Sequence, residues 1–191
     1  MTRLIIEAAL VQQFVEREGW DFFFIGGIAV QIWGEPRLTK DVDLTIFTNL
    51  DDEPGRIKRI LLEYKPKFHD AGAFALSNRV LPVTSPGGVT IDFTLAGLAD
   101  ISEPLARSSY QDFGDGNLLK ICSPDDLIIM KTLAGRTRDW PDIEAVLIKQ
   151  RNLDWEYIDS SIAALTEHSY EGDLPEKRRH LAKLRELYYR P

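Results

Sequence analysis

Two apolar runs decide the fold of this chain: Phe22-Phe23-Phe24-Ile25-Gly26-Gly27 and, after thirteen intervening residues, Asp41-Val42-Asp43-Leu44-Thr45-Ile46-Phe47. Side chains alternate between the two faces of a β-strand. The second run would therefore present Asp41 and Asp43 on one face and its apolar residues on the other. The apolar face predicts a buried core, and the opposite face predicts two neighbouring carboxylates.

A pair of carboxylates this close together calls for a cation, because the two charges repel and raise one pKa unless they are neutralised. Oxygen ligands of this kind suit Mg²⁺ or Mn²⁺. A third acid fits the pattern, since residues 89–95 alternate apolar and polar and would place Asp92 on the open face of a half-buried strand. If that strand lies beside the Asp41 strand, the three carboxylates would hold two ions roughly 3.5 to 4 Å apart, the spacing used in phosphoryl displacement.

The two glycines at the end of the first run predict a phosphate-binding turn. Gly26 and Gly27 lack Cβ atoms, so the backbone can approach a triphosphate and turn sharply into a helix over residues 28–33. The N-terminus of that helix would favour an anion. An ordinary strand-to-helix turn is the alternative, and the downstream Asp pair favours the phosphate-binding interpretation.

Together these residues resemble the DNA polymerase β-like nucleotidyltransferase superfamily, whose hallmark is Gly-Gly or Gly-Ser after an apolar residue, then Asp-apolar-Asp or Glu, and a third acid on a later strand. Further strings, within residues 20 to 145, resemble its AbiEii/MenT-type toxin branch: Arg37-Leu38-Thr39-Lys40-Asp41-Val42-Asp43, Ser123-Pro124-Asp125-Asp126-Leu127, Lys131, and Ala134-Gly135-Arg136-Thr137-Arg138-Asp139.

The resemblance implies a metal-dependent transfer of an NMP from an NTP to an acceptor hydroxyl. Asp41 and Asp43 would bind both metals, and Asp92 would complete the site of the metal at the acceptor hydroxyl and take its proton. A tRNA 3′ end or another macromolecule would be the acceptor, and an antitoxin protein would be a partner. Transfer to a small molecule such as an antibiotic, or a non-catalytic relative that binds nucleotides or a partner, are the alternatives.

Lys131 is a candidate contact for the nucleotide phosphates. It follows an apolar stretch in a predicted helix, where an unpaired cation is costly to bury, so it requires an anion. The resemblance makes that anion the NTP, with Arg37 as a further phosphate contact and Thr39 as a residue that orients Asp41. A lysine that extends to the surface is the alternative.

Four residues near Lys131 and its helix are left without a settled role. Arg136 and Arg138 would assist the same anion, bind substrate or be solvated. Asp139 is predicted to be an N-cap of the next helix, and Asp142 stays open.

Composition and charge limit the classes of protein to which this chain can belong. The 191 residues are 44% hydrophobic, enough for a sizeable core, and no apolar run approaches the roughly 18 residues of a membrane span. The single cysteine, Cys122, cannot form an internal disulfide and is predicted to be a buried strand residue. The lack of disulfides predicts a cytoplasmic protein. The net charge of −7 counts against a general nucleic-acid binder. Residues 176–190 nevertheless carry six Lys or Arg against two Glu, which suits a tRNA stem or a solvated helix face.

Periodicity predicts an α/β (α+β) fold with a mixed-sheet core over residues 1–122 and a helical C-terminal portion over residues 123–191. Helices are predicted at 3–17, 28–33, 53–64, 123–135, 139–150, 154–168 and 175–189. Strands are predicted from Phe22, over 41–47, 80–84 and 89–95, and as a hairpin over 109–112 and 118–121.

Overall fold

The computed structural model describes residues 2–97, 101–167 and 173–190, and it divides the chain into two compact units. The sheet unit comprises residues 1–28 and 38–122, and the helical unit comprises residues 29–37 and 123–191. Residues 29–37 therefore belong to the helical unit, although the sequence patterns placed them in the core over residues 1–122. Within the described residues, no helix is both long and apolar enough for a membrane span.

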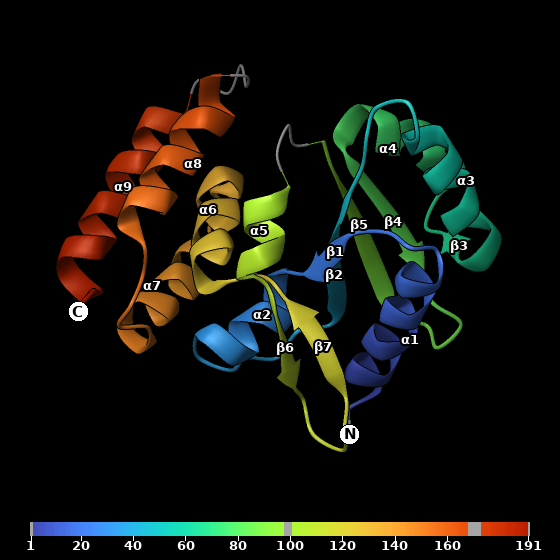
Figure 1. Ribbon diagram of the computed structural model, residues 1–191, viewed down its shortest axis with the longest axis horizontal. Coiled ribbons are helices and arrows are strands. Elements are labelled where there is room, and N and C mark those ends of the chain that lie inside the picture. The colour runs from blue at the N-terminus through green and yellow to red at the C-terminus, as the bar shows by residue number, and fades with distance from the viewer. Residues whose placement is uncertain (1, 98–100, 168–172, 191) are drawn as a thin grey trace. The chain divides into compact units, whose positions relative to one another are not determined.

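The sheet unit contains one mixed sheet, in which the described strands follow the order β3-β4-β5-β2-β1-β7-β6 (Figure 1). The strands are β1 (Phe22–Phe24), β2 (Asp41–Phe47), β3 (Lys65–Pro66), β4 (Val80–Thr84), β5 (Thr90–Ala96), β6 (Ser109–Asp112) and β7 (Leu118–Ile121). The helices of this unit are α1 (Arg3–Arg17), α3 (Glu53–Glu63), α4 (Ala71–Asn78) and α5 (Ser102–Arg107). Helix α2 (Gly26–Trp33) begins in this unit and runs into the other.

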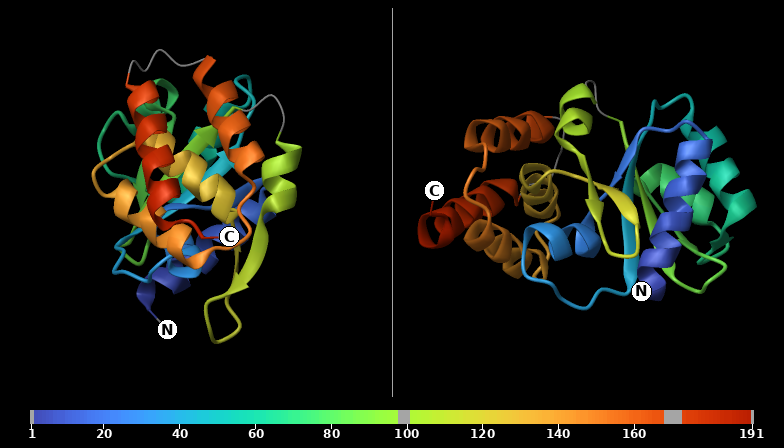
Figure 2. Two further views of the ribbon diagram at one scale, coloured as in Figure 1. Left: turned by 90° about the vertical axis from the view of Figure 1, so that its left-hand side faces the viewer. Right: turned by 60° about the horizontal axis from the view of Figure 1, so that its bottom comes forward.

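Strand β2 lies inside the sheet, antiparallel to β1 and parallel to β5. On β5 the side chains of Ile91, Phe93 and Leu95 are buried, whereas the residues between them are half-buried. The buried face packs on helices, because the ring of Phe93 lies 5.8 Å from Tyr64, whose ring lies 5.3 Å from Phe14 of α1. Figure 2 shows α1 and α3 on that side of the sheet. The acids of β2 and β5 therefore lie on the opposite face.

The helical unit is built around α6 (Pro124–Ala134), which contacts α8 (Trp155–Glu167), α9 (Leu174–Tyr188) and α7 (Asp139–Lys149). Helix α6 begins and ends as the sequence predicts. The Ser123 hydroxyl accepts a hydrogen bond from the Asp126 amide at 3.0 Å, Pro124 occupies the first turn, and Gly135 ends the helix with a φ of 59°.

The predicted fold class is confirmed, and most predicted elements agree with the structure within two residues. Helix α2 begins at Gly26 instead of residue 28, so both glycines belong to its first turn. The predicted end of the helix before α9, His168, lies outside the described residues. Three elements have no counterpart in the sequence-based prediction: β3, α4 and α5.

Candidate functional site

Three acids lie at neighbouring positions on one face of the sheet, which we call the carboxylate face: Asp41 and Asp43 of β2 and Asp92 of β5. In the parallel register of β2 and β5, Asp43 is the direct partner of Asp92, and Asp41 lies two residues before Asp43 on the same face. All three are half-buried. Adjacent strands are about 4.8 Å apart, so Asp43 and Asp92 bring like charges close together, an arrangement that a cation would stabilise.

Gly26 is required by the position of Asp43. Its φ of +61° lies in the left-handed region, and a Cβ atom on it would lie 2.6 Å from Cγ of Asp43. The amide of Ile25 also donates a hydrogen bond to the Asp43 carbonyl at 3.0 Å. The Asp43 carboxylate therefore packs against the first turn of α2, where the helix dipole favours a negative charge.

Gly27 is required by Thr39 in the same way. A Cβ atom on Gly27 would lie 2.6 Å from Cβ of Thr39, and the Thr39 hydroxyl donates to the Asp41 carbonyl at 3.4 Å. Thr39 is thus held between the start of α2 and the start of β2. The space that a side chain on either glycine would fill contains side chains of this chain, which is a reason for the glycines that the sequence does not reveal.

Thr45 adds an oxygen to the carboxylate face that the sequence did not single out as a ligand. It follows Asp43 by two residues on β2 and is 1% exposed, and its hydroxyl has no hydrogen-bond partner within the described residues. A buried hydroxyl without a partner costs free energy, so its position beside the acids fits a bound ligand or ion. No three His, Cys, Asp or Glu side chains in residues 2–97, 101–167 and 173–190 form a ready metal-binding cluster. The fit to Mg²⁺ therefore rests on the all-oxygen donors and on the register.

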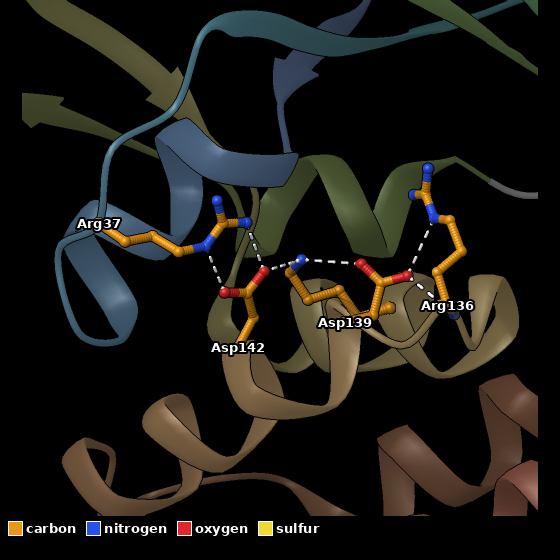
Figure 3. Close-up of polar contacts among 5 residues, drawn as sticks. Arg37, Arg136, Asp139 and Asp142 are labelled. Atoms are coloured by element: carbon orange, nitrogen blue, oxygen red, sulfur yellow. Dashed lines mark hydrogen bonds and ion pairs between the residues drawn. The ribbon is translucent and has the colours of Figure 1, made fainter.

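The helical unit holds a second group of charges, here called the charged row, in which cations and anions alternate (Figure 3). Its members are Arg37, Asp142, Lys131, Asp139 and Arg136. Lys131 is 6% exposed, and its Nζ lies 2.6 Å from Oδ2 of Asp142 and 3.2 Å from Oδ1 of Asp139. The two carboxylates are also buried, with exposures of 3% and 2%.

Each aspartate of the charged row has an arginine on its far side. Nε and Nη2 of Arg37 donate to the two oxygens of Asp142 at 2.6 and 2.7 Å, a bidentate pair. The backbone amide and Nε of Arg136 donate to Oδ2 of Asp139 at 3.1 and 3.0 Å. Burial alone would raise the pKa of Asp142, but hydrogen bonds from Arg37 and Lys131 outweigh it, and the pKa is lowered.

The charged row changes the interpretation of several predicted residues. Asp139 is not the N-cap of α7, because that position belongs to Arg138 and Asp139 is the first helical residue. The anion that buried Lys131 requires is supplied by two aspartates of its own unit. Arg37, predicted as a phosphate contact, is hydrogen-bonded to Asp142. Arg138, whose role the sequence left open, is exposed. The sequence could not reveal the pairing of Arg37 with Asp142, since the two residues are 105 positions apart.

The cationic C-terminal stretch forms helix α9, and part of its charge is used within the helical unit. Lys177 pairs with Asp173 at 3.2 Å and donates to the Leu133 carbonyl, and Arg185 lies 4.0 Å from the centre of the Trp155 ring. The ring of His180 stacks on Trp140 with centroids 4.2 Å apart.

Comparisons with solved structures reveal the same fold in three nucleotidyltransferase-type proteins. The first is an antigenic nucleotidyltransferase-like protein from Paracoccidioides brasiliensis, with 16% identity, a TM-score of 0.52, and coverage of 98% of this chain and 94% of the other. The second is the antibiotic-resistance factor ANT(2'')-Ia, with 19% identity, a TM-score of 0.52, and coverage of 92% and 96%. The third is the lincosamide antibiotic adenylyltransferase LnuA, with 12% identity, a TM-score of 0.51, and coverage of 76% and 96%.

At the level of sequence, no curated protein matches the chain. A family profile does match, over residues 11–188, and its description is nucleotidyl transferase AbiEii toxin, type IV toxin–antitoxin system. The matched region contains the carboxylate face, both glycines and the charged row. The chain therefore belongs to the AbiEii family of nucleotidyltransferase toxins.

Proposed function

We propose that this nucleotidyltransferase depends on a divalent metal and transfers an NMP from an NTP to an acceptor hydroxyl. The observation that carries the proposal is the register of β2 and β5, which makes Asp92 the partner of Asp43 on the face that also bears Asp41. The buried hydroxyl of Thr45 beside these acids and the adjoining first turn of α2 support a ligand there.

In the proposed reaction, Asp41, Asp43 and Asp92 would hold Mg²⁺ or Mn²⁺, and the first turn of α2 at Gly26 and Gly27 would receive the NTP phosphates. The bound ions would supply positive charge to the triphosphate and the departing pyrophosphate. Asp92 accepts the proton of the acceptor hydroxyl while the hydroxyl oxygen forms a bond to the α-phosphorus. The bond between the α-phosphorus and the oxygen that bridges it to the β-phosphorus breaks, so pyrophosphate leaves. The products are an NMP adduct and pyrophosphate. The phosphate contact predicted for Lys131 stays a prediction, and a contact with phosphate would compete with the ion pairs that this lysine forms with two buried aspartates.

For the acceptor we propose a cellular macromolecule, with a tRNA 3′ end as the first candidate and the cytoplasm as the compartment. The toxin family and the cations of α9 that are exposed, such as Lys183, support this choice. The family also supports an antitoxin protein as a partner. Phosphate-backbone binding by α9 would weaken steeply with salt.

A small cationic acceptor is the second candidate, favoured by the net charge of −7, which would attract an aminoglycoside-like molecule. Two of the proteins that share the fold are, by their descriptions, an antibiotic-resistance factor and a lincosamide adenylyltransferase. A third candidate is a non-catalytic relative that binds nucleotides or a partner protein.

One labelling experiment separates these candidates. Each of the four α-³²P-NTPs is incubated with the protein and Mg²⁺ or Mn²⁺, with total RNA, total cell protein and a panel of antibiotics in parallel. We expect label in the tRNA fraction, its loss with a metal chelator, and its loss in the Asp41→Ala/Asp43→Ala double variant. Label in an antibiotic supports the second candidate. The absence of both label transfer and pyrophosphate release in every arm would contradict the proposal that the protein is an active nucleotidyltransferase.

A further inference from the structure

Lys131 is already ion-paired with two aspartates inside the helical unit. Its Nζ lies within ion-pair distance of both Asp139 and Asp142, and the lysine and both carboxylates are buried. If Nζ moved to an external phosphate, it would leave two buried carboxylates with one partner fewer, and removal of one partner from a buried ion pair is strongly destabilising. The geometry therefore favours a role for Lys131 within the charged row.

That role is to orient Asp142. Oδ2 of Asp142 accepts hydrogen bonds from both Lys131 Nζ, at 2.6 Å, and Arg37 Nη2, at 2.7 Å, while Oδ1 accepts from Arg37 Nε at 2.6 Å. A bidentate pair of this kind requires the plane of the carboxylate to match the guanidinium. The ammonium group of Lys131 helps to fix the plane of the Asp142 carboxylate, because it donates to Oδ2, the same oxygen that accepts from Arg37 Nη2.

Arg37 in turn anchors an exposed connection. Residues 35–40 form neither helix nor strand, and all are exposed except half-buried Thr39. Arg37 is the last residue of the helical unit's N-terminal segment, and the sheet unit resumes at Leu38. Two residues later the Thr39 hydroxyl contacts the Asp41 carbonyl, and β2 begins at Asp41. The conformation of this short connection determines how the chain enters the strand that carries Asp41 and Asp43.

We propose that Lys131 is a positioning residue: through Asp142 it fixes Arg37, and thereby the connection 35–40 that leads into the carboxylate face. On the other side Asp139 forms a second ion pair with Lys131, and Asp139 is itself held by Arg136. Because Lys131 touches neither the NTP nor the metals in this scheme, its loss should lower turnover without weakening NTP binding. The effect on turnover rests on the proposed function, whereas the anchoring of the connection does not.

Trypsin tests the anchoring without any need for enzyme activity. Trypsin cleaves after arginine and lysine, so the connection contains two sites, after Arg37 and after Lys40, and exposed Lys67 provides a reference site in the sheet unit. In Lys131→Met and Asp142→Asn we expect the summed cleavage after Arg37 and Lys40, relative to Lys67, to be about tenfold faster than in the wild type, because local opening exposes the connection. Arg138→Gln, an exposed arginine next to the row, is the matched control and should leave the ratio unchanged. A rise smaller than about threefold in both row variants overturns the proposal.

Kinetics test the consequence once label transfer has been observed. Arg37→Gln, Lys131→Met and Asp142→Asn should each lower kcat by about tenfold or more while the KM for the NTP stays within about twofold of the wild type. A rise in KM confined to Lys131→Met would assign this lysine to the phosphates and overturn the proposal. If the wild type transfers no label, the proposed function fails, and the proteolysis result still decides the anchoring.

Discussion

Aspartates occupy two contrasting settings in this protein. On the carboxylate face, Asp43 and Asp92 lie half-buried as strand partners and bring like charges together. In the charged row, Asp139 and Asp142 are buried between three cations, at distances of 2.6 to 3.2 Å. In the first arrangement a bound cation would relieve the repulsion between the two strand partners. In the second each carboxylate is paired, and removal of any one partner would destabilise the helical unit. The same residue type thus supports the proposed binding site in one unit and forms internal ion pairs in the other.

Substitution of Asp43 should produce the largest effect, and on activity alone. Asp43→Asn removes one charge from the carboxylate face, and label transfer should fall by about three orders of magnitude because several kcal/mol of transition-state stabilisation are lost. The melting temperature should change by only a few degrees, because the relieved repulsion with Asp92 and the lost attraction to the first turn of α2 oppose each other. Residual transfer near the wild-type level would contradict the site, and a large drop in melting temperature would contradict the contrast.

In the charged row the same kind of change should reduce stability. Asp142→Ala leaves the buried charge of Lys131 with one partner fewer, and the free energy of unfolding should fall by about 3 kcal/mol. Denaturant titration followed by circular dichroism measures this change. Asp41→Ala is the matched control on the other unit and should cost less than about 1 kcal/mol. Equal losses in the two variants would erase the distinction between the settings.

Glycine substitutions test how tightly Asp43 is held. Gly26→Ala places a Cβ atom 2.6 Å from Cγ of Asp43 at a φ of +61°, so it should cost about 2 kcal/mol of stability and reduce label transfer as well. Gly55→Ala offers the control, because nothing lies within 4 Å of its Cβ position. That variant should be as stable as the wild type or up to about 1 kcal/mol more stable. A well-tolerated Gly26→Ala would contradict the packing of Asp43 on α2.

Acid titration should give the smallest effect. The pKa of Asp142 is lowered from its ordinary value of 3.8, so the folded state binds this proton less readily than the unfolded state. The stabilisation is therefore complete above pH 4 and is lost as the pH falls through the lowered pKa, with a slope of at most about 1.4 kcal/mol per pH unit for one proton. Comparison of wild type with Asp142→Asn in denaturant titrations between pH 2 and 6 isolates this term. Parallel stability curves would show that Asp142 makes no such contribution.

Strong local patterns allowed most of the fold to be predicted. The alternation at Asp41–Phe47 marks β2, and Ser123 with Pro124 and Gly135 brackets α6. Helix α4 was missed because its run of Ala and Gly has no apolar period, and α5 because it contains Pro104 and buries no side chain. Strand β3 has only two residues and is visible only through its pairing with β4.

The candidate site also combines features that local sequence patterns predict with features that depend on the tertiary fold. The face of each acid follows from strand alternation, which is local, whereas the pairing of Asp43 with Asp92 depends on the order of strands in the sheet. The sequence correctly indicates that buried Lys131 requires an anion, but it cannot reveal which one. The resemblance favoured a nucleotide, and the structure provides Asp139 and Asp142.

The parallel pairing of β2 with β5 has a consequence for how the protein is made. Asp43 and Asp92 are about fifty residues apart in the chain, and α3, β3, α4 and β4 lie between their strands. Contacts of such long sequence separation form late, since a large loop must close first. A nascent chain on the ribosome therefore carries its first two acids long before the third can join them. If the carboxylate face is the active site, as proposed, catalysis has to wait until β5 has been synthesised and has paired with β2.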